Sequence, residues 1–597
     1  MKRPTFFQRW GKYVRPYWKY FILGPVCMIV EVLGEIILPS LYASIINTGV
    51  EGADVGHIVL ICGLMVLTSV GMMLGGVGGA YFGARAAVNF AADLRRDVFA
   101  KVQKFSFANI DRFSTGSLVT RLTNDVTQLM NFVNMLLRMF LRTPGMLIGA
   151  LVMVIVRDPE LARVLAITIP VLLVVQVLVI RAGFPRFTRM QGRIDALNTD
   201  VQENLTNVRV VKSFVREDFE QQKFDHANGE LKQAGLGAMR VMVTMMPLMM
   251  LVMNLTSVAV VWLGGNRVVA GTMLVGDLSA FITYMTQILM ALLMVSMMFM
   301  ISSRSMASAR RISEVLDEQI DLTDENCARP ELRVEQGSVE FRNVSFRYYK
   351  NSEEKVLDDV NLRILPGQTV GVIGSTGSGK STLVSMIPRL YDVDEGEVLV
   401  DGVNVKDYSL KHLRDGVGMV LQKNVLFSGT IAENLRWGDE DASDDAVRSA
   451  ARSAQADGFI ESFTEGYESG LDQGGANVSG GQKQRLCIAR ALLKKPKILI
   501  LDDSTSAVDT ATEAKIRRAF TNELKDSTKI IIAQRISSVR DADQIIVLDE
   551  GRITGVGTHD ELLRTNQAYQ EIYESQESGH ESVMAEAAAP VDGKEGV

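Results

Sequence analysis

Long apolar runs alternate with polar connections over the first half of the chain. Each run is close to the ~20 residues that a helix needs to cross a bilayer. The runs lie at residues 21–46, 57–80, 136–156, 162–182, 242–263 and 274–301. The pattern therefore predicts six transmembrane helices.

The connections between these runs alternate in length, and two of them are long. Residues 81–135 and 183–241 keep a helical periodicity and carry most of the nearby lysines and arginines. Positive residues favour the cytoplasmic side of a membrane. If each membrane helix continues outward by some 25 residues, at 1.5 Å per residue, it projects roughly 40 Å from the membrane. We therefore expect two long cytoplasmic extensions.

The pattern changes after the segment 312–332, beyond which short β-rich runs punctuated by glycine alternate with polar helices. This alternation is typical of a soluble α/β domain. The basic and aromatic N-terminus suits a helix lying in the inner headgroup layer. We divide the chain into a transmembrane domain (1–318), a linker (319–337), an α/β domain (338–574) and an acidic tail expected to be disordered (575–597).

Composition adds two exclusions to this picture. The formal net charge of −6 gives no reason to expect a nucleic-acid partner. The four cysteines are scattered, without the spacing of a disulfide framework or a zinc site. With 47% hydrophobic residues, the chain needs a lipid bilayer around its first half.

A phosphate-binding loop follows an apolar strand of the α/β domain. Its sequence GSTGSGKS fits G-x-x-x-x-G-K-[ST], in which backbone N–H groups surround phosphates, Lys380 reaches the β- and γ-phosphates and Ser381 can ligate Mg²⁺. The strand KILILDD supplies Asp502 as a carboxylate on the metal side. The expected ATP-binding residues of the loop are Gly374, Ser375, Thr376, Gly377, Ser378, Gly379, Lys380, Ser381 and Thr382.

The sequence VSGGQ between these two motifs resembles the signature of ATP-binding cassette (ABC) transporters. The matching residues are Ser479, Gly480, Gly481 and Gln482. With six membrane helices ahead of the cassette, nearly the whole chain is similar to exporter-type half-transporters. The resemblance implies that Tyr348 stacks on adenine, that Gln422 is the lid glutamine and a metal ligand with Ser381 and Asp502, and that Asp509 belongs to the D-loop.

Two residues depart from the family pattern. Asp503 stands where the family usually has a catalytic Glu, and it is one methylene shorter. Gln534 stands in the place of the switch histidine and cannot carry its positive charge. Together they predict a degenerate site that holds ATP and hydrolyses it slowly. The alternative is that Asp and Gln work adequately in a homodimer.

The intact signature leads to a different expectation for the partner. The family's two cassettes close head to tail, so each site combines one chain's phosphate loop with the other chain's signature. We therefore expect a second, unlike half-transporter that carries the Glu and the His. Residues 113–126 and 204–218 resemble the two segments that couple cassettes to membrane helices, and the second is expected to reach the partner's cassette.

Polar and flexible side chains within the spans are candidates for cargo binding. Glu31 and Glu35, one turn apart, are costly in hydrocarbon, so they either pair with protein groups or receive a cationic cargo. Methionine is dense from 239 to 306, where it suits a surface that repacks around dissimilar guests or an ordinary core. The candidates are Met246, Met250, Met294 and Met298. Gly71, Gly75, Gly79 and Gly83 predict close helix packing.

The leading hypothesis is an ATP- and Mg²⁺-dependent exporter of amphipathic or hydrophobic small molecules, of the multidrug type. A lipid or peptide exporter of the same architecture remains open, as does an ATP-gated channel or regulatory subunit. The N-terminus and the cassette are expected in the cytoplasm. The fused arrangement, with no evident targeting segment, favours the plasma membrane of a bacterium.

Overall fold

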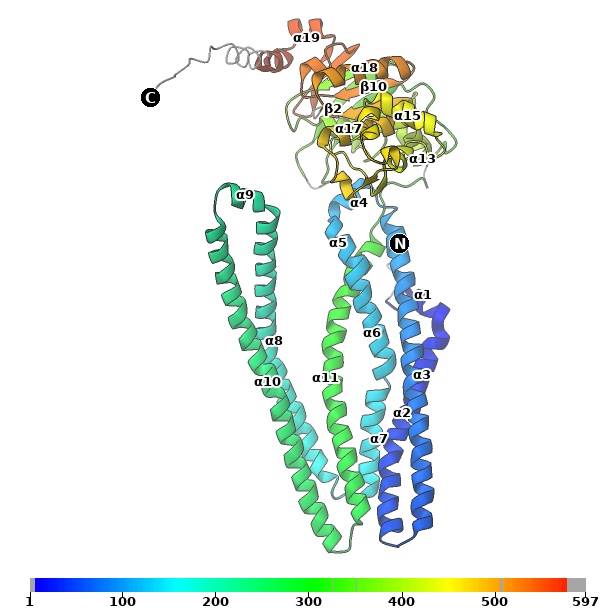
Figure 1. Ribbon diagram of the computed structural model, residues 1–597, viewed down its shortest axis with the longest axis vertical. Coiled ribbons are helices and arrows are strands. Elements are labelled where there is room, and N and C mark those ends of the chain that lie inside the picture. Colours follow the sequence, from blue (N-terminus) through cyan, green and yellow to red (C-terminus); the bar gives the residue numbers. More distant parts are fainter. Residues whose placement is uncertain (1–5, 326, 351, 505–507, 577–597) are drawn as a thin grey trace, which may run out of the picture. The chain divides into compact units, whose positions relative to one another are not determined.

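A computed structural model describes residues 6–576 except 326, 351 and 505–507. The chain divides into two compact units (Figure 1). The first comprises residues 1–103 and 116–317, and the second comprises 104–115 and 318–597. Each is considered by itself.

The first unit is helical. Among the described residues it contains six helical stretches long and apolar enough to cross a membrane, which confirms the predicted number. Its α-helices are α1 (Phe6–Val14), α2 (Trp18–Ser44), α3 (Val55–Val102), α5 (Thr115–Thr120), α6 (Val126–Met139), α7 (Arg142–Arg157), α8 (Arg163–Thr206), α9 (Val208–Ser213), α10 (Glu217–Val269) and α11 (Val275–Asp317). Shorter 3₁₀ or π turns are η1 (Arg15–Tyr17), η2 (Ile45–Val50) and η3 (Arg121–Asp125).

Helices α2 and α3 pack backbone to backbone through the glycine repeat. A methyl group added at Gly75 would lie 2.8 Å from the Cys27 carbonyl oxygen, and one at Gly79 would meet Met28 Sδ at 2.3 Å. One added at Gly71 would meet nothing within 4 Å. The predicted close packing is therefore present at Gly75 and Gly79, whereas Gly71 lies beyond it.

Both long connections extend membrane helices, but in different ways. Helices α8 and α10 continue without a break to a hairpin tip formed by the short helix α9 (Figure 1). The first connection is interrupted after α3 and resumes through α4 (Phe107–Arg112), α5 and η3. Helix α4 belongs to the second unit. The N-terminal helix α1 contacts α3, where Tyr13 is buried against Phe90.

The second unit is an α/β domain, as predicted. Its strands are β1 (Val339–Phe346), β2 (Leu357–Ile364), β3 (Thr369–Ile373), β4 (Glu395–Val400), β5 (Val403–Asn404), β6 (Val417–Val420), β7 (Gly429–Thr430), β8 (Gly470–Leu471), β9 (Ile498–Asp502), β10 (Thr528–Ile532), β11 (Gln544–Asp549) and β12 (Arg552–Gly557). They form a six-stranded sheet in the order β12-β11-β3-β10-β9-β6, a four-stranded sheet in the order β2-β1-β4-β5, and the pair β7-β8.

Helices and turns surround these sheets. The α-helices are α12 (Lys380–Ser385), α13 (Leu410–Gly416), α14 (Ile431–Arg436), α15 (Asp444–Ser453), α16 (Asp457–Glu461), α17 (Gly480–Leu493), α18 (Thr510–Glu523) and α19 (His559–Thr565). The 3₁₀ turns are η4 (Val405–Asp407), η5 (Gly466–Glu468), η6 (Gln473–Gly475) and η7 (Ile536–Ser538). A final helical segment spans 567–576.

Three parallel neighbours in the large sheet position the site. Strands β3, β10 and β9 run side by side in the same direction, and every residue of β9 and β10 is buried. Continuous apolar runs of this kind are typical of strands covered on both faces. Because parallel strands end at the same sheet edge, the segments after Ile373, Asp502 and Ile532 lie together.

The C-terminal boundary differs from the prediction. We placed the start of a disordered tail at residue 575, but Ser575 and Gln576 belong to the helix 567–576 of the second unit, and Gln576 accepts a hydrogen bond from the Ile536 N–H. The remaining tail residues, 577–597, lie outside the described residues.

Candidate nucleotide site

The phosphate-binding loop connects β3 to α12 and depends on glycine at two points. Gly374 and Gly379 have φ angles of 157° and 98°. A Cβ at Gly374 would lie 2.0 Å from the Leu548 carbonyl oxygen, and one at Gly379 would lie 2.8 Å from that of Val356. Only glycine satisfies both the dihedral angle and the space. The loop therefore curls closely against neighbouring backbone.

A cleft of about 800 Å³ opens beside this loop. The predicted residues that line it are Tyr348, Gly374, Ser375, Thr376, Gly377, Gly379, Lys380, Ser381, Thr382, Gln422, Asp502, Asp503 and Gln534. Ser378, which also belongs to the loop, is buried and does not line the cleft. The structure thus brings together residues spread over nearly 190 positions of sequence. The resulting cleft has the size and the hydrogen-bonding groups of a nucleotide site.

Lys380 and the Ser381–Asp502 pair form the charged centre of the cleft. Lys380 Nζ donates to the carbonyl oxygens of Gly374 and Ser375 at 2.9 and 2.6 Å. Burial lowers the pKa of Lys380, while the charges of Asp502 and Asp503 oppose that shift. Ser381 Oγ donates to Asp502 Oδ1 at 2.9 Å. Hydroxyl and carboxylate oxygens are the ligands that Mg²⁺ prefers, so this pair fits a metal on the phosphate side.

Asp503 is held by two neutral amides. Gln534 Nε2 donates to Asp503 Oδ2 at 2.8 Å. Burial raises the pKa of the Asp503 carboxyl, and hydrogen bonds from Gln534 and Gln422 oppose the rise. Its backbone lies in the left-handed region, with φ of 47°, and its N–H donates to the Ile532 carbonyl. The Asp503 carboxylate is therefore hydrogen-bonded to Gln534, the residue in the switch position.

Tyr348 stands at the rim of the cleft and is 43% exposed, which leaves a ring face for a base. Its hydroxyl hydrogen-bonds to Thr382 Oγ1 at 2.9 Å. The edge of its ring meets Tyr391 with centroids 5.2 Å apart. The position agrees with the adenine-stacking role that the resemblance implies.

Tyr391 links the surroundings of Tyr348 to helix α4, and it was not predicted from the sequence. Its hydroxyl donates to Asp111 Oδ2 at 2.8 Å, and its ring lies 6.0 Å from that of Phe107. Burial raises the pKa of Tyr391, and the bond to Asp111 adds to the rise. These contacts come from α4, which immediately precedes the segment 113–126. We expected that segment to couple the cassette to the membrane helices.

The signature residues form the N-terminus of α17. Ser479 caps the helix: its Oγ accepts from the Gln482 N–H at 3.3 Å, and its own N–H donates to Gln482 Oε1 at 2.8 Å. Ser479 and Gly480 are exposed, and Gly481 follows them in the first turn. A free helix N-terminus attracts anions. The exposed N-terminus of α17 therefore has the chemistry of an anion-binding surface. Asp509 caps α18 by accepting from the Thr512 N–H.

The membrane candidates are distributed over three helices. Glu31 and Glu35 on α2 share Arg142 of α7, whose Nη2 lies 3.2 Å from Glu31 Oε1 and 2.6 Å from Glu35 Oε1. Met246 and Met250 are exposed on α10, whereas Met294 and Met298 are partly buried on α11. The glutamates thus have a structural partner in this chain.

Comparison with known proteins agrees with both units. Residues 21–292 match the ABC transporter transmembrane region, and residues 357–506 match the ABC transporter family. The chain is 40% identical over 564 residues to the ABC transporter ATP-binding protein YfiB of Bacillus subtilis, covering 94% of this chain and 97% of that protein. The chain belongs to the ABC transporters.

Two further relatives of this ABC transporter bear on its architecture and cargo. A solved bacterial Atm1-family ABC exporter with ATP bound superposes with a TM-score of 0.77 at 26% identity, covering 94% of this chain and 98% of that one. A fatty acid ABC transporter ATP-binding/permease protein of Mycobacterium tuberculosis is 36% identical over 479 residues, covering 80% of this chain and 75% of that protein. The chain is an exporter-type half-transporter, a multi-pass membrane protein whose ATPase drives transport.

Proposed function

We propose that this half-transporter exports amphipathic or hydrophobic small molecules as one half of an asymmetric heterodimer. Its own nucleotide site holds ATP and Mg²⁺ through Lys380, Ser381, Asp502 and Gln422. This site hydrolyses ATP slowly. Its signature completes a competent site on an unlike partner that carries the Glu and the His. The cassette and the N-terminus face the cytoplasm of a bacterial cell.

The observation that carries this proposal is the Gln534–Asp503 hydrogen bond of 2.8 Å. A general base has to reach the attacking water, and Asp503 is both a methylene shorter than Glu and engaged by amides. An amide cannot become the cation that a histidine offers to developing negative charge. The first step of hydrolysis therefore lacks both a well-placed base and a switchable cation.

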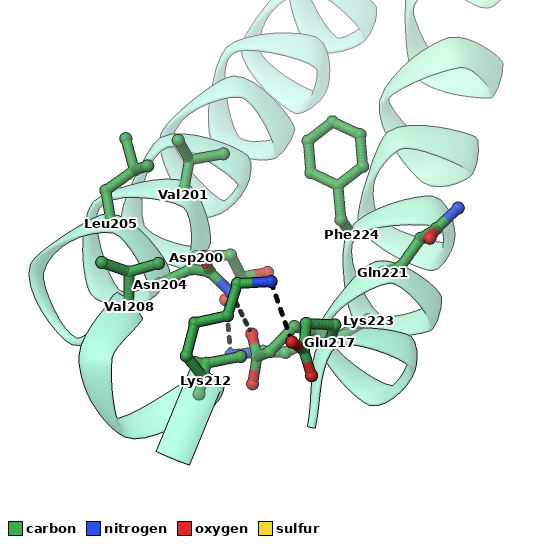
Figure 2. Close-up of a pocket in the computed structure, with 12 residues that line it drawn as sticks. Asp200, Val201, Asn204, Leu205, Val208, Lys212, Glu217, Gln221, Lys223 and Phe224 are labelled. Carbon is green, nitrogen blue, oxygen red and sulfur yellow. Dashed lines mark hydrogen bonds and ion pairs between the residues drawn. The ribbon is translucent and has the colours of Figure 1, made fainter. Parts of the chain in front are cut away.

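The second cytoplasmic loop supports a dimer. The tip of the α8–α10 hairpin encloses a hollow of about 420 Å³, whose apolar wall includes Val201, Leu205 and Phe224 (Figure 2). Ion pairs such as Lys212 to Glu217, 2.8 Å apart, brace its base. Phe214 and Val215 at the tip are 72% and 80% exposed. Apolar tips of this kind are interaction surfaces, and we propose that this one docks on the partner's cassette.

The matching surface on the cassette is an aromatic pair. Phe427 and Trp437 stack with centroids 4.2 Å apart and remain 43% and 65% exposed. Arg490 lies against Phe427 at 5.9 Å and fixes the edge of this patch. We propose that this patch receives the partner's second loop, so that each subunit's membrane helices respond to the other's ATP.

An anionic lipid or fatty acid is a second candidate cargo. A cleft of about 500 Å³ between α8 and α10 has apolar walls that include Val175, Leu178 and Leu248, and it carries Arg186 and Arg240. Acyl chains fit such walls, and a carboxylate or phosphate pairs with arginine. The relative named as a fatty acid transporter points the same way. Glu31, Glu35 and the four methionines stay proposed contacts for the cargo cavity.

The test is an asymmetric pair of variants in the purified heterodimer. Replacing Ser479 or Gly480 of this chain should abolish most ATP turnover, because both contribute to the partner's site. Asp503→Asn should leave most of the turnover, because this chain's site contributes little. Equal losses from the two classes of variant would refute the asymmetry.

A further inference from the structure

One face of the C-terminal helix, residues 567–576, forms part of the wall of the nucleotide cleft. The residues lining the cleft recur at intervals of three and four, which places them on a single helix face. They are Ala568, Glu571, Ile572, Ser575 and Gln576. The helix therefore contributes a continuous strip of side chains to the wall of the cleft.

The helix is anchored where it begins. Asn566 Oδ1 accepts from the Tyr569 N–H at 2.8 Å, and Asn566 Nδ2 donates to the Thr554 carbonyl at 3.0 Å. Tyr569 is fully buried and its hydroxyl hydrogen-bonds to His559 Nδ1 at 2.8 Å. These contacts tie the helix to β12 and α19. The helix is therefore a fixed element with a defined face toward the cleft.

Gln576 binds the backbone of residues 534–536, here called the switch loop, through both the oxygen and the nitrogen of its side-chain amide. Its Oε1 accepts from the Ile536 N–H at 2.9 Å, and its Nε2 donates to the Gln534 carbonyl at 2.8 Å. The Gln534 side chain in turn donates to Asp503 Oδ2. A continuous chain of hydrogen bonds thus runs from the C-terminal helix through the switch loop to the acid that follows β9.

We propose that Gln576 is a positioning residue, and that the C-terminal helix sets how firmly this site retains ATP by fixing the switch loop. The inference rests on the proposed function only in treating the site as one that retains nucleotide. Gln576 itself acts on the loop backbone and reaches Asp503 through Gln534. Each hydrogen bond lost corresponds to about a fivefold change in an equilibrium constant, so losing both weakens retention by about fivefold to about 25-fold.

The experiment measures release of a non-hydrolysable ATP analogue from full-length protein after an excess of unlabelled ATP is added. Gln576→Ala should release the analogue faster by the factor given above. Gln570→Ala is the matched control, because Gln570 is a glutamine of the same helix whose amide also donates to a backbone carbonyl, that of Leu563, and it does not line the cleft. The control should release at the wild-type rate.

A double-mutant cycle separates positioning from general loosening of the fold. In a Gln534→Ala background, Gln576→Ala should accelerate release no further, because the link to Asp503 is already absent. Gln576→Glu, which keeps the acceptor for Ile536 N–H and loses the donor to Gln534, should give an intermediate rate if the alanine variant folds poorly. Additive effects, or a Gln576→Ala rate equal to the control, would overturn the inference.

The analogue keeps this result separate from the proposed function. If wild-type protein hydrolyses ATP rapidly, the degenerate-site proposal fails, yet the comparison of release rates still reports on Gln576. If release is unchanged in Gln576→Ala while hydrolysis stays slow, the proposed function stands and the role of Gln576 is rejected.

Discussion

Gly75 gives a sharp test of how α2 and α3 pack. In Gly75→Ala the new methyl group would lie 2.8 Å from the Cys27 carbonyl oxygen and 3.0 Å from the Glu31 nitrogen. Both atoms are backbone, so neither can rotate away. Ordinary contact begins at 3.4 Å, and 3.4 minus 2.8 leaves 0.6 Å by which the helices have to separate. Overpacking of this kind costs about 1–3 kcal/mol.

Gly71→Ala is the matched control, since a methyl group there meets nothing within 4 Å. Both variants gain the same helix propensity, up to ~1 kcal/mol, so their difference isolates the clash. At about 1–2 °C per kcal/mol for a unit of roughly 300 residues, the thermal midpoint of Gly75→Ala should lie about 1–6 °C below that of Gly71→Ala. The midpoints are measured on purified protein in lipid nanodiscs. Coincident midpoints would refute the packing described for α2 and α3.

Three further predictions follow from the cassette. Tyr391→Phe removes the hydrogen bond to Asp111 and keeps the ring contacts, so transport per ATP hydrolysed should fall while ATP affinity is retained; the ratio of cargo flux to phosphate release measures it. Asp401→Ala removes an acceptor for four consecutive N–H groups at 335–338 and should lower stability by about 2–4 kcal/mol, measured by denaturant unfolding. Burial raises the pKa of Cys487, so raising the pH to about 9 should leave it unlabelled by iodoacetamide in folded protein, as peptide mapping reports.

The sequence predicts best those features that are local. Six apolar runs indicate six spans because a bilayer demands length and hydrophobicity and little else. The loop from Gly374 to Ser381 is equally legible, because two glycines with special dihedral angles and one lysine are required within eight positions. Strand β9 and the carboxylates after it follow from a continuous apolar run ending in acids.

Contacts between distant segments escaped prediction. Arg142 pairs with Glu35 across 107 positions, and Tyr391 bonds Asp111 across 280. A one-dimensional pattern carries no signal for which distant polar groups will face each other once helices pack. Gln576 was missed for a different reason: it borders an acidic, low-complexity segment, and composition assigned it to the tail.

The central claim is that this chain's own site grips ATP more than it cleaves it. The most direct measurement is single-turnover hydrolysis by the purified heterodimer whose partner site has been inactivated, compared between wild type and the double variant Asp503→Glu, Gln534→His of this chain. We predict slow cleavage with retained ATP in the wild type, and a rise of about 100-fold or more when the base and the cation are supplied together. Rapid cleavage by the wild type, unchanged in the double variant, would contradict the account.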